Sequence, residues 1–175
     1  MDKLVKDLLN LSRLETGSFK LEQTIFDFTA LSEESKARFA KALADKHILA
    51  KWELPAEMNV YGDPERIDTI LTNFLSNAID YTPVGRHIHV FADDLGKRYR
   101  ICVYNEGSHI GEEYQQRIWE PFYKIDSSGP AARNAFGGHG LGLGTVAALV
   151  KLHGETYGVR NEKDGVTFWF TIKKR

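Results

Sequence analysis

The chain has 175 residues, of which 42% are hydrophobic and 27% charged, and its formal net charge at pH 7 is -1. This length fits one domain with a hydrophobic core, and the near-neutral charge gives no support for a generally basic surface that would coat nucleic acid. A single cysteine excludes a disulfide framework within the chain, and without a signal-peptide segment or an apolar run of about 18 residues the expected setting is a reducing, cytoplasmic one.

The first predicted element is an amphipathic helix over residues 3–15. Leu4, Leu8 and Leu11 recur at helical spacing with charges on the opposite face, and Gly17 is placed to end the helix in a left-handed conformation. A helix this short is marginal alone in water, so its leucines need a partner. Periodicity leaves two partners open: the same domain, or another helix in a longer dimerising coiled coil.

Strands and helices alternate between residues 24 and 85. The clearest helix start in this region follows Asp63. This acid is an N-cap residue, Pro64 comes directly after it, and Glu65 lies near the positive end of the helix dipole. Its apolar stripe runs from Ile67 to Ile79. The elements predicted before it are a strand at 24–28, a helix to about residue 45, and strands near 47–54 and 59–61.

Alternating residues then predict a hairpin of two strands, 86–92 and 98–103, with inward positions at Ile88, Val90, Ile101 and Val103. In the last strand, Val166, Phe168, Phe170 and Ile172 alternate with Thr167, Trp169 and Thr171. The whole pattern predicts an α+β fold, a two-layer α/β sandwich with a mixed sheet and helices packed on one face. The remaining predicted elements are a brief helical stretch at 112–119, a helix at 141–153 and a strand at 156–160.

Asn73 and Asn77 lie four residues apart beside the apolar stripe of one helix, so both carboxamides point the same way. Asparagine is a mediocre helix-interior residue because its side chain competes for backbone hydrogen bonds. Two on one face suggest a function, although for the pair alone a structural role is the alternative.

Two further segments combine polar residues with turns. Asn105 and Gly107 follow a strand, where they can form the edge of a ligand site or an ordinary strand-to-turn junction. The segment Trp119-Glu-Pro-Phe122-Tyr-Lys124 precedes a polar stretch over residues 126–134, which is too long for a tight connection. Internal loops of this kind are usually functional lids.

A glycine cluster over residues 137–144 runs straight into the helix predicted near its end. Glycines at a helix start let backbone N–H groups surround phosphate oxygens, helped by the positive end of the helix dipole. A dinucleotide fingerprint would need a strand directly before the glycines, and a P-loop would need Gly-Lys-Ser/Thr at the helix start. Neither is present, so a phosphate cradle of another type is predicted, with a flexible hinge as the alternative.

Taken in order, these four blocks resemble the N, G1, F and G2 boxes of the GHKL superfamily of ATPases and kinases, and more narrowly those of bacterial sensor histidine kinases. Asn73-Phe-Leu-Ser-Asn77-Ala-Ile-Asp-Tyr81 is similar to the N box, and Gly138-His-Gly140-Leu-Gly142-Leu143 is similar to the G2 box. The segment from Leu8 to Gly17 resembles the end of the second dimerisation helix in such kinases. The resemblance implies three parts: the end of the dimerisation and phospho-acceptor helix at 1–17, a catalytic ATP-binding domain at 18–175, and an ATP lid at about 111–139.

The resemblance also implies a role for each matching residue. Asn77 would give a carboxamide oxygen to Mg²⁺, and Asn73 would help to position the phosphates and the metal-bound water. Tyr81 would pack on the adenine, and Asn105 would read its amino group. Lys124 would neutralise phosphate charge and, with the two asparagines, is expected to be catalytic. The other residues that the resemblance assigns to ATP binding are Gly107, Ile110, Phe122, Arg133, Gly138, Gly140, Leu141, Gly142, Leu143 and Thr167.

The implied reaction is transfer of the γ-phosphoryl group rather than hydrolysis. In the ATP-hydrolysing relatives, the position of Asn73 resembles a general-base glutamate, and an asparagine cannot take a proton from water. None of the six histidines is followed by the residues of the family's acceptor motif. The acceptor histidine is therefore expected on a separate dimerisation domain, and this fragment is expected to bind Mg-ATP without phosphorylating itself.

Three residues depart from the family pattern. Asn105 and His109 stand where the G1 box usually has aspartate and glycine, and Asp80 stands where a basic residue often touches phosphate. An asparagine carbonyl still accepts a hydrogen bond from the adenine amino group, at a loss of about 1–2 kcal/mol of charge assistance.

The resemblance implies a response regulator as partner, a homodimer in the full-length protein, and a cytoplasmic domain of an inner-membrane sensor. Neither nucleic-acid binding nor membrane insertion of this fragment is expected. Two other functions stay open: an anti-sigma-factor serine kinase of the same fold, and a degenerate scaffold without catalysis. The stalk-like first helix argues against the former, and the departures at Asp80, Asn105 and His109 are the basis of the latter.

Overall fold

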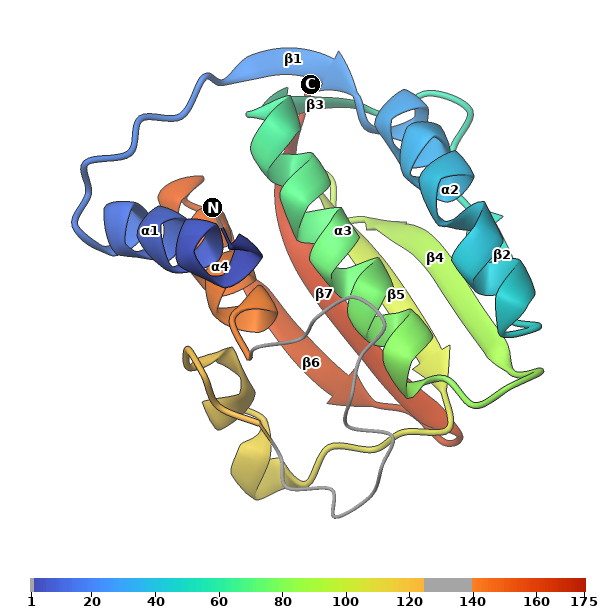
Figure 1. Cartoon of the computed structure of the whole chain (residues 1–175). Helices are drawn as coiled ribbons and strands as arrows, with labels where there is room; N and C mark the ends of the chain where they lie inside the picture. Colours follow the sequence, from blue (N-terminus) through green and yellow to red (C-terminus); the bar gives the residue numbers. More distant parts are fainter. Residues whose placement is uncertain (1, 125–139) are drawn as a thin grey trace.

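The computed structural model describes residues 2–124 and 140–175 of the chain. A seven-stranded sheet forms one layer and the helices α1 to α4 lie on one of its faces (Figure 1). This confirms the predicted two-layer sandwich. The elements are α1 (Lys3–Glu15), β1 (Thr24–Asp27), α2 (Phe28–Asp45), β2 (Leu49–Glu53), β3 (Asn59–Gly62), α3 (Pro64–Tyr81), β4 (His87–Asp94), β5 (Arg98–Glu106), the 3₁₀ turns η1 (Glu112–Tyr114) and η2 (Arg117–Trp119), α4 (Gly142–Leu152), β6 (Tyr157–Asn161) and β7 (Gly165–Lys174).

The sheet is mixed, with strand order β1-β3-β7-β5-β4-β2 and with β6 paired to β7. Only β2 and β4 run parallel to each other; the other pairs are antiparallel. The long central pair of β5 and β7 runs from Arg98 opposite Lys173 to Glu106 opposite Gly165. Helix α3 lies over the face of this pair in Figure 1.

The core lies between the sheet and the helices, and strand alternation decides which residues enter it. Ile88, Val90, Ile101 and Val103, the predicted inward positions of the hairpin, are at most 1% exposed. The apolar stripe of α3 from Ile67 to Ile79 packs in the same core and is at most 4% exposed. Burial of such side chains stabilises a fold by roughly 1.5–3 kcal/mol each, so this layer supplies most of the driving force.

Two elements differ from the sequence prediction for identifiable reasons. The first strand ends at Asp27 because its carboxylate caps α2, accepting hydrogen bonds from the backbone N–H of Thr29 and of Met58, both at 2.9 Å. The helix predicted at 112–119 is instead two 3₁₀ turns. The Trp119 indole donates to the Gln115 carbonyl at 2.9 Å, the acceptor that a continuous α-helix would have offered to the Trp119 backbone N–H.

The N-terminal helix docks on its own domain. α1 contacts α4, with Leu11 3% exposed and Leu14 packed against the core. A second apolar face of α1 remains open, since Val5, Leu8 and Leu9 are 44–46% exposed. Within this domain, α1 therefore buries only the face that carries Leu11 and Leu14. Among the described residues, no helix combines the length and apolar character needed to cross a bilayer.

One buried cluster joins α3 to α4. Asp63, 5% exposed, accepts hydrogen bonds from the Glu22 N–H at 2.9 Å and from the Arg66 N–H at 3.2 Å. Its own N–H donates to His153 Nε2 at 3.1 Å, while His153 Nδ1 lies 2.7 Å from the Leu149 carbonyl. Both contacts are hydrogen bonds when the ring is neutral with its proton on Nδ1. The start of α3 is thereby fixed to the end of α4.

Candidate functional site

The two asparagines of α3 lie on the side of that helix that faces the start of α4. Asn73 Nδ2 donates to the Thr69 carbonyl at 2.9 Å, which fixes the carboxamide and leaves its Oδ1 toward Gly142. A Cβ atom at Gly142 would lie 2.8 Å from that oxygen, so only glycine fits without displacing the asparagine. Asn77 follows one turn later, and its side chain makes no hydrogen bond within the described part of the chain.

Gly140 and Phe122, predicted from separate motifs, are in direct contact. The Phe122 N–H donates to the Gly140 carbonyl at 2.9 Å. Gly140 has φ +76°, and a Cβ there would lie 3.0 Å from the Phe122 Cα and carbonyl carbon. Both the backbone conformation and the close approach to Phe122 therefore favour glycine at this position. Phe122 itself has φ +64° and a ring that is 55% exposed. Leu141, 3% exposed, anchors the segment that leads into α4.

The turn after β5 packs against the end of α3. Gly107 has φ +92°, and a Cβ there would lie 2.6 Å from Pro83 Cδ. The Ser108 hydroxyl donates to the Tyr81 carbonyl at 3.1 Å, and the Tyr81 side chain is 55% exposed beside it. These contacts bring the residues predicted from the asparagine helix and from the strand-end turn into one region.

Sequence reasoning missed Asn161, which ends β6 and holds this turn in place. Its Oδ1 accepts from the Ile110 N–H at 2.9 Å, and its Nδ2 donates to the Ile110 carbonyl at 2.7 Å. Ile110 is thus held by both backbone groups and is 9% exposed. An asparagine at a strand end, about fifty residues from its partner, carries no local signal of such a contact.

Asn105 lies on β5 between Ile88 of β4 and Val166 of β7, facing the helices, and is 2% exposed. Its Nδ2 is buried and finds no hydrogen-bond partner among the described residues. A buried donor left unpaired costs about 1–3 kcal/mol. Such a group in a polar site is a natural contact for a ligand.

Lys46 binds the C-terminal end of α3 beside Asp80. Its Nζ donates to the Ile79 carbonyl at 2.6 Å and to the Asp80 carbonyl at 3.0 Å, at the negative end of the α3 dipole. Burial raises the pKa of the Asp80 carboxyl to about 6, and the charge of Lys46 opposes that shift. No local pattern near residue 80 could have identified this lysine.

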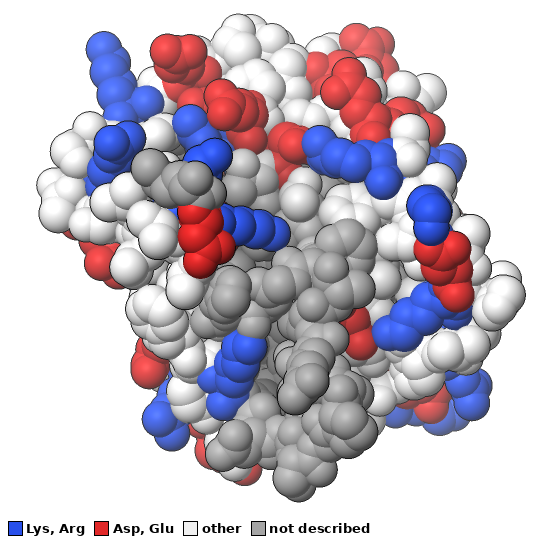
Figure 2. Space-filling view, viewed as in Figure 1, with Lys and Arg blue, Asp and Glu red and all other residues white. Residues whose placement is uncertain are grey.

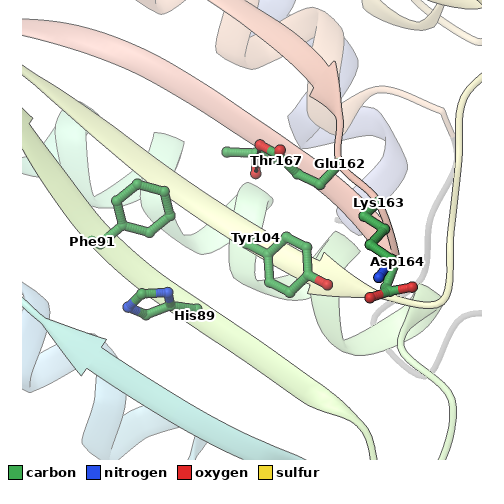
Figure 3. A pocket seen from close by; sticks show the side chains of 7 residues that line it. All are labelled: His89, Phe91, Tyr104, Glu162, Lys163, Asp164 and Thr167. Atoms are coloured by element: carbon green, nitrogen blue, oxygen red, sulfur yellow. Dashed lines mark hydrogen bonds between the residues drawn. The ribbon is translucent and has the colours of Figure 1, made fainter.

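Thr167 is not brought together with the other predicted residues. It faces the side of the sheet opposite the helices, where its hydroxyl donates to Glu162 Oε1 at 3.0 Å. With His89, Phe91 and Tyr104 it lines an open hollow of about 350 Å³ (Figure 3). Val166 holds the inward position beside Asn105 instead.

The other predicted residues divide between described and undescribed parts of the chain. Lys124 is exposed and ends the first described range, and Leu143 packs against the core from the first turn of α4. Arg133 and Gly138, with most of the predicted lid, lie outside the described residues. On the helix side of the molecule, acidic and basic residues are interspersed (Figure 2).

Comparison with known proteins gives one sequence family and many relatives. Residues 62–175 match the family described as histidine kinase-, DNA gyrase B-, and HSP90-like ATPase. The sensor protein VanSB of Enterococcus faecalis is 31% identical over 181 residues, which cover 97% of this chain and 37% of VanSB. The chain spans well under half the length of the curated relatives that it matches.

Solved structures agree with these matches. The nucleotide-free catalytic domain of histidine kinase ThkA is 28% identical with a TM-score of 0.76, covering 88% of this chain and 98% of that one. Full-length ShkA in complex with AMPPNP is 26% identical with a TM-score of 0.82, over 98% of this chain and 36% of that one. ThkA in complex with the response regulator protein TrrA, at 24% identity and a TM-score of 0.75 over 99% of this chain and 48% of that one, shares the fold.

Proposed function

Because this chain belongs to the family of histidine kinase-, DNA gyrase B- and HSP90-like ATPases, we propose that it binds Mg-ATP and transfers the γ-phosphoryl group to a histidine. That histidine would lie on a separate dimerisation domain. In the transfer, the bond between the γ-phosphorus and the β,γ-bridging oxygen breaks, a phosphorus–nitrogen bond to the imidazole forms, and ADP leaves. Similarity to named sensor kinases such as VanSB supports this choice within the family.

A single contact carries the proposal: the Asn73 carboxamide of α3 faces Gly142 at the first residue of α4. The start of a helix presents unpaired backbone N–H groups and the positive end of its dipole, which together favour phosphate oxygens. Gly140 and Gly142 carry no side chain, and a Cβ at either position would meet Phe122 or Asn73. A polyphosphate would thus be held between an amide-rich helix start and the polar side of α3.

The donor set suits magnesium bound together with a nucleotide. Within residues 2–124 and 140–175, no three His, Cys, Asp or Glu side chains gather where they could hold a metal ion. Mg²⁺ keeps several waters and commonly takes one or two protein oxygens together with substrate phosphates. The carboxamide oxygen of Asn77, which makes no hydrogen bond to the described residues, would be that protein ligand, and Asn73 would orient phosphate and water.

Asparagine at position 73 favours transfer over hydrolysis. A carboxamide cannot accept a proton from an attacking water, so the site contributes positioning and charge stabilisation rather than general-base catalysis. An imidazole nitrogen needs no such base, because it attacks through its own lone pair. Lys124, exposed at the border of the lid segment, would add positive charge near the transferred group.

The proposed partners rest on the similarity to named sensor histidine kinases. A response regulator would receive the phosphoryl group from the phosphohistidine, and ThkA is a relative solved with such a protein. Helix α1 would be the end of a dimerisation helix in the full-length protein, and its exposed residues Val5, Leu8 and Leu9 would pack against the other dimerisation helices. The domain would then lie on the cytoplasmic side of an inner-membrane sensor.

A transfer assay tests the function directly. Incubated alone with γ-labelled ATP and Mg²⁺, the chain is expected to gain no acid-labile phosphate, because its histidines lack an acceptor motif. Adding a separate helical domain that carries the acceptor histidine is expected to give acid-labile, alkali-stable label on that domain. Label on a serine of an antagonist protein would favour an anti-sigma-factor kinase, and binding of Mg-ATP without transfer to either would favour a scaffold.

Gly142→Ala tests the contact between α3 and α4. The added methyl group would lie 2.8 Å from Asn73 Oδ1 and must turn that carboxamide away. We expect Mg-ATP to bind at least about tenfold more weakly by calorimetry, because a charge-assisted contact is worth about 1.5–3 kcal/mol. Gly144→Ala is the matched control: its Cβ would lie 3.4 Å from Pro121 and would not approach Asn73. Equal affinities of the two variants would contradict the proposed geometry.

A further inference from the structure

We propose that Asn105 makes the nucleotide site tolerant at position 6 of the purine, so that 6-oxopurine triphosphates such as ITP bind alongside ATP. The inference rests on the proposed binding of a purine nucleotide and adds which bases the site accepts. It starts from one side chain near the end of β5, the buried Asn105 carboxamide, whose nitrogen has no hydrogen-bond partner among residues 2–124 and 140–175.

Asn105 is free to present either end of its carboxamide. No side-chain hydrogen bond to it exists in the described part of the chain, and its neighbours across the ladder, Ile88 and Val166, are aliphatic. Rotation by 180° about the Cβ–Cγ bond exchanges the N–H donors and the carbonyl acceptor. Neither orientation breaks a contact with these neighbours, so the ligand decides which one is adopted.

The polar groups around Asn105 are already engaged. The Gly107 N–H donates to the Asp164 carbonyl at 2.8 Å, and the Ser108 hydroxyl donates to the Tyr81 carbonyl. Both backbone groups of Ile110 are bonded to Asn161. A base edge that reaches this turn would therefore be read by Asn105 rather than by the Gly107 N–H or the backbone of Ile110.

The two purine edges are complementary to opposite orientations of a carboxamide. Adenine offers an amino donor at position 6 and an acceptor at N1, whereas hypoxanthine offers a carbonyl acceptor at position 6 and a donor at N1. An amide pairs with either edge, because it carries both a donor and an acceptor. A carboxylate accepts only. The oxygen that would accept from the adenine amino group would repel the 6-oxo group of hypoxanthine, which offers a carboxylate a donor only at N1. The uncharged residue at 105 removes that repulsion.

Calorimetric titration of the whole chain with Mg-ATP and with Mg-ITP tests the inference, because the two ligands differ only at this edge. For the natural sequence we expect dissociation constants within about fivefold of each other, since each ligand finds a partner in the same amide. In Asn105→Asp, we expect Mg-ITP to bind at least about tenfold more weakly relative to Mg-ATP. The ratio of the two affinities in one preparation does not depend on how much of the protein is folded.

Asn105→Leu provides the second variant. It removes both donor and acceptor, so both nucleotides should weaken by a similar factor and their ratio should stay near that of the natural sequence. Binding of Mg-ATP with Mg-ITP more than about fiftyfold weaker would overturn the inference and leave the proposed function standing. An unchanged ratio in Asn105→Asp would overturn it equally. Binding of neither nucleotide would overturn the proposed function, and this inference with it.

Discussion

In Asn77→Ala, calorimetric titration with Mg-ATP is expected to show no heat of binding under conditions that saturate the natural sequence. The substitution removes the carboxamide oxygen proposed to bind Mg²⁺ and puts nothing in its place. Loss of a contact to a charged group costs about 1.5–3 kcal/mol, and the ion also bridges the phosphates, so a loss of about 100-fold or more in affinity is expected.

Two controls make this result specific to the metal. Asn59→Ala makes the same replacement on β3, where the side chain only donates to Glu57 Oε1 at 2.7 Å, and should bind Mg-ATP normally. With Mg²⁺ removed by a chelator, Asn77→Ala and the natural sequence should bind ATP equally weakly. A titration of Asn77→Ala within about threefold of the natural sequence would show that Asn77 does not hold the ion.

Gly165→Ala is expected to have the largest effect on stability. A Cβ at this position would lie 2.1 Å from the Asn105 carbonyl oxygen and 2.7 Å from Tyr104 Cε2. The clash is with the backbone of the paired strand, so β5 and β7 must separate at the end of their ladder where Gly165 lies opposite Glu106. Overpacking of this kind costs about 3 kcal/mol or more, which corresponds to a fall of roughly 6–12 °C in Tm for a domain of this size.

Gly96→Ala is the matched control for the Gly165 variant. Gly96 lies in the hairpin turn with φ +84° and has nothing within 4 Å of a Cβ, so its replacement adds backbone strain of about 1–2 kcal/mol without a clash. Thermal unfolding of both variants separates the two causes. A Gly165 variant as stable as the Gly96 variant would mean that the strands adjust at little cost.

Patterns within single elements predicted most of the fold. Asp63 before Pro64 placed the start of α3, and alternation along β7 separated Val166 and Phe168 from Thr167. The same alternation puts Thr167 on the face of the sheet opposite the helices, where the structure has it, and its assignment to ATP binding from the family resemblance stays a prediction. Strand parity is fixed by backbone geometry, whereas a residue assigned from a motif can move one position along a strand and so change face.

The residue types that form the site were also available from the sequence. Two carboxamides four residues apart must share a side of a helix, and glycines before a helix must leave its N–H groups open. These are local consequences of helix geometry, so the asparagines of α3 and the glycines at 140 and 142 could be named as candidates without a fold. The sequence did not show that the Asn73 carboxamide lies against Gly142.

The sequence by itself determined most of the helices and strands, the shared side of α3 on which Asn73 and Asn77 lie, and the family to which they point. Only the tertiary structure decided that Asn161 holds Ile110, that Lys46 reaches the end of α3, and that the Asn105 amide nitrogen has no partner among the described residues. The physical reason is the distance along the chain over which each effect acts. Propensity and periodicity act over one or two turns of chain, but hydrogen-bond satisfaction at Ile110 or Asn105 depends on which distant segment the packed sheet and helices bring beside it.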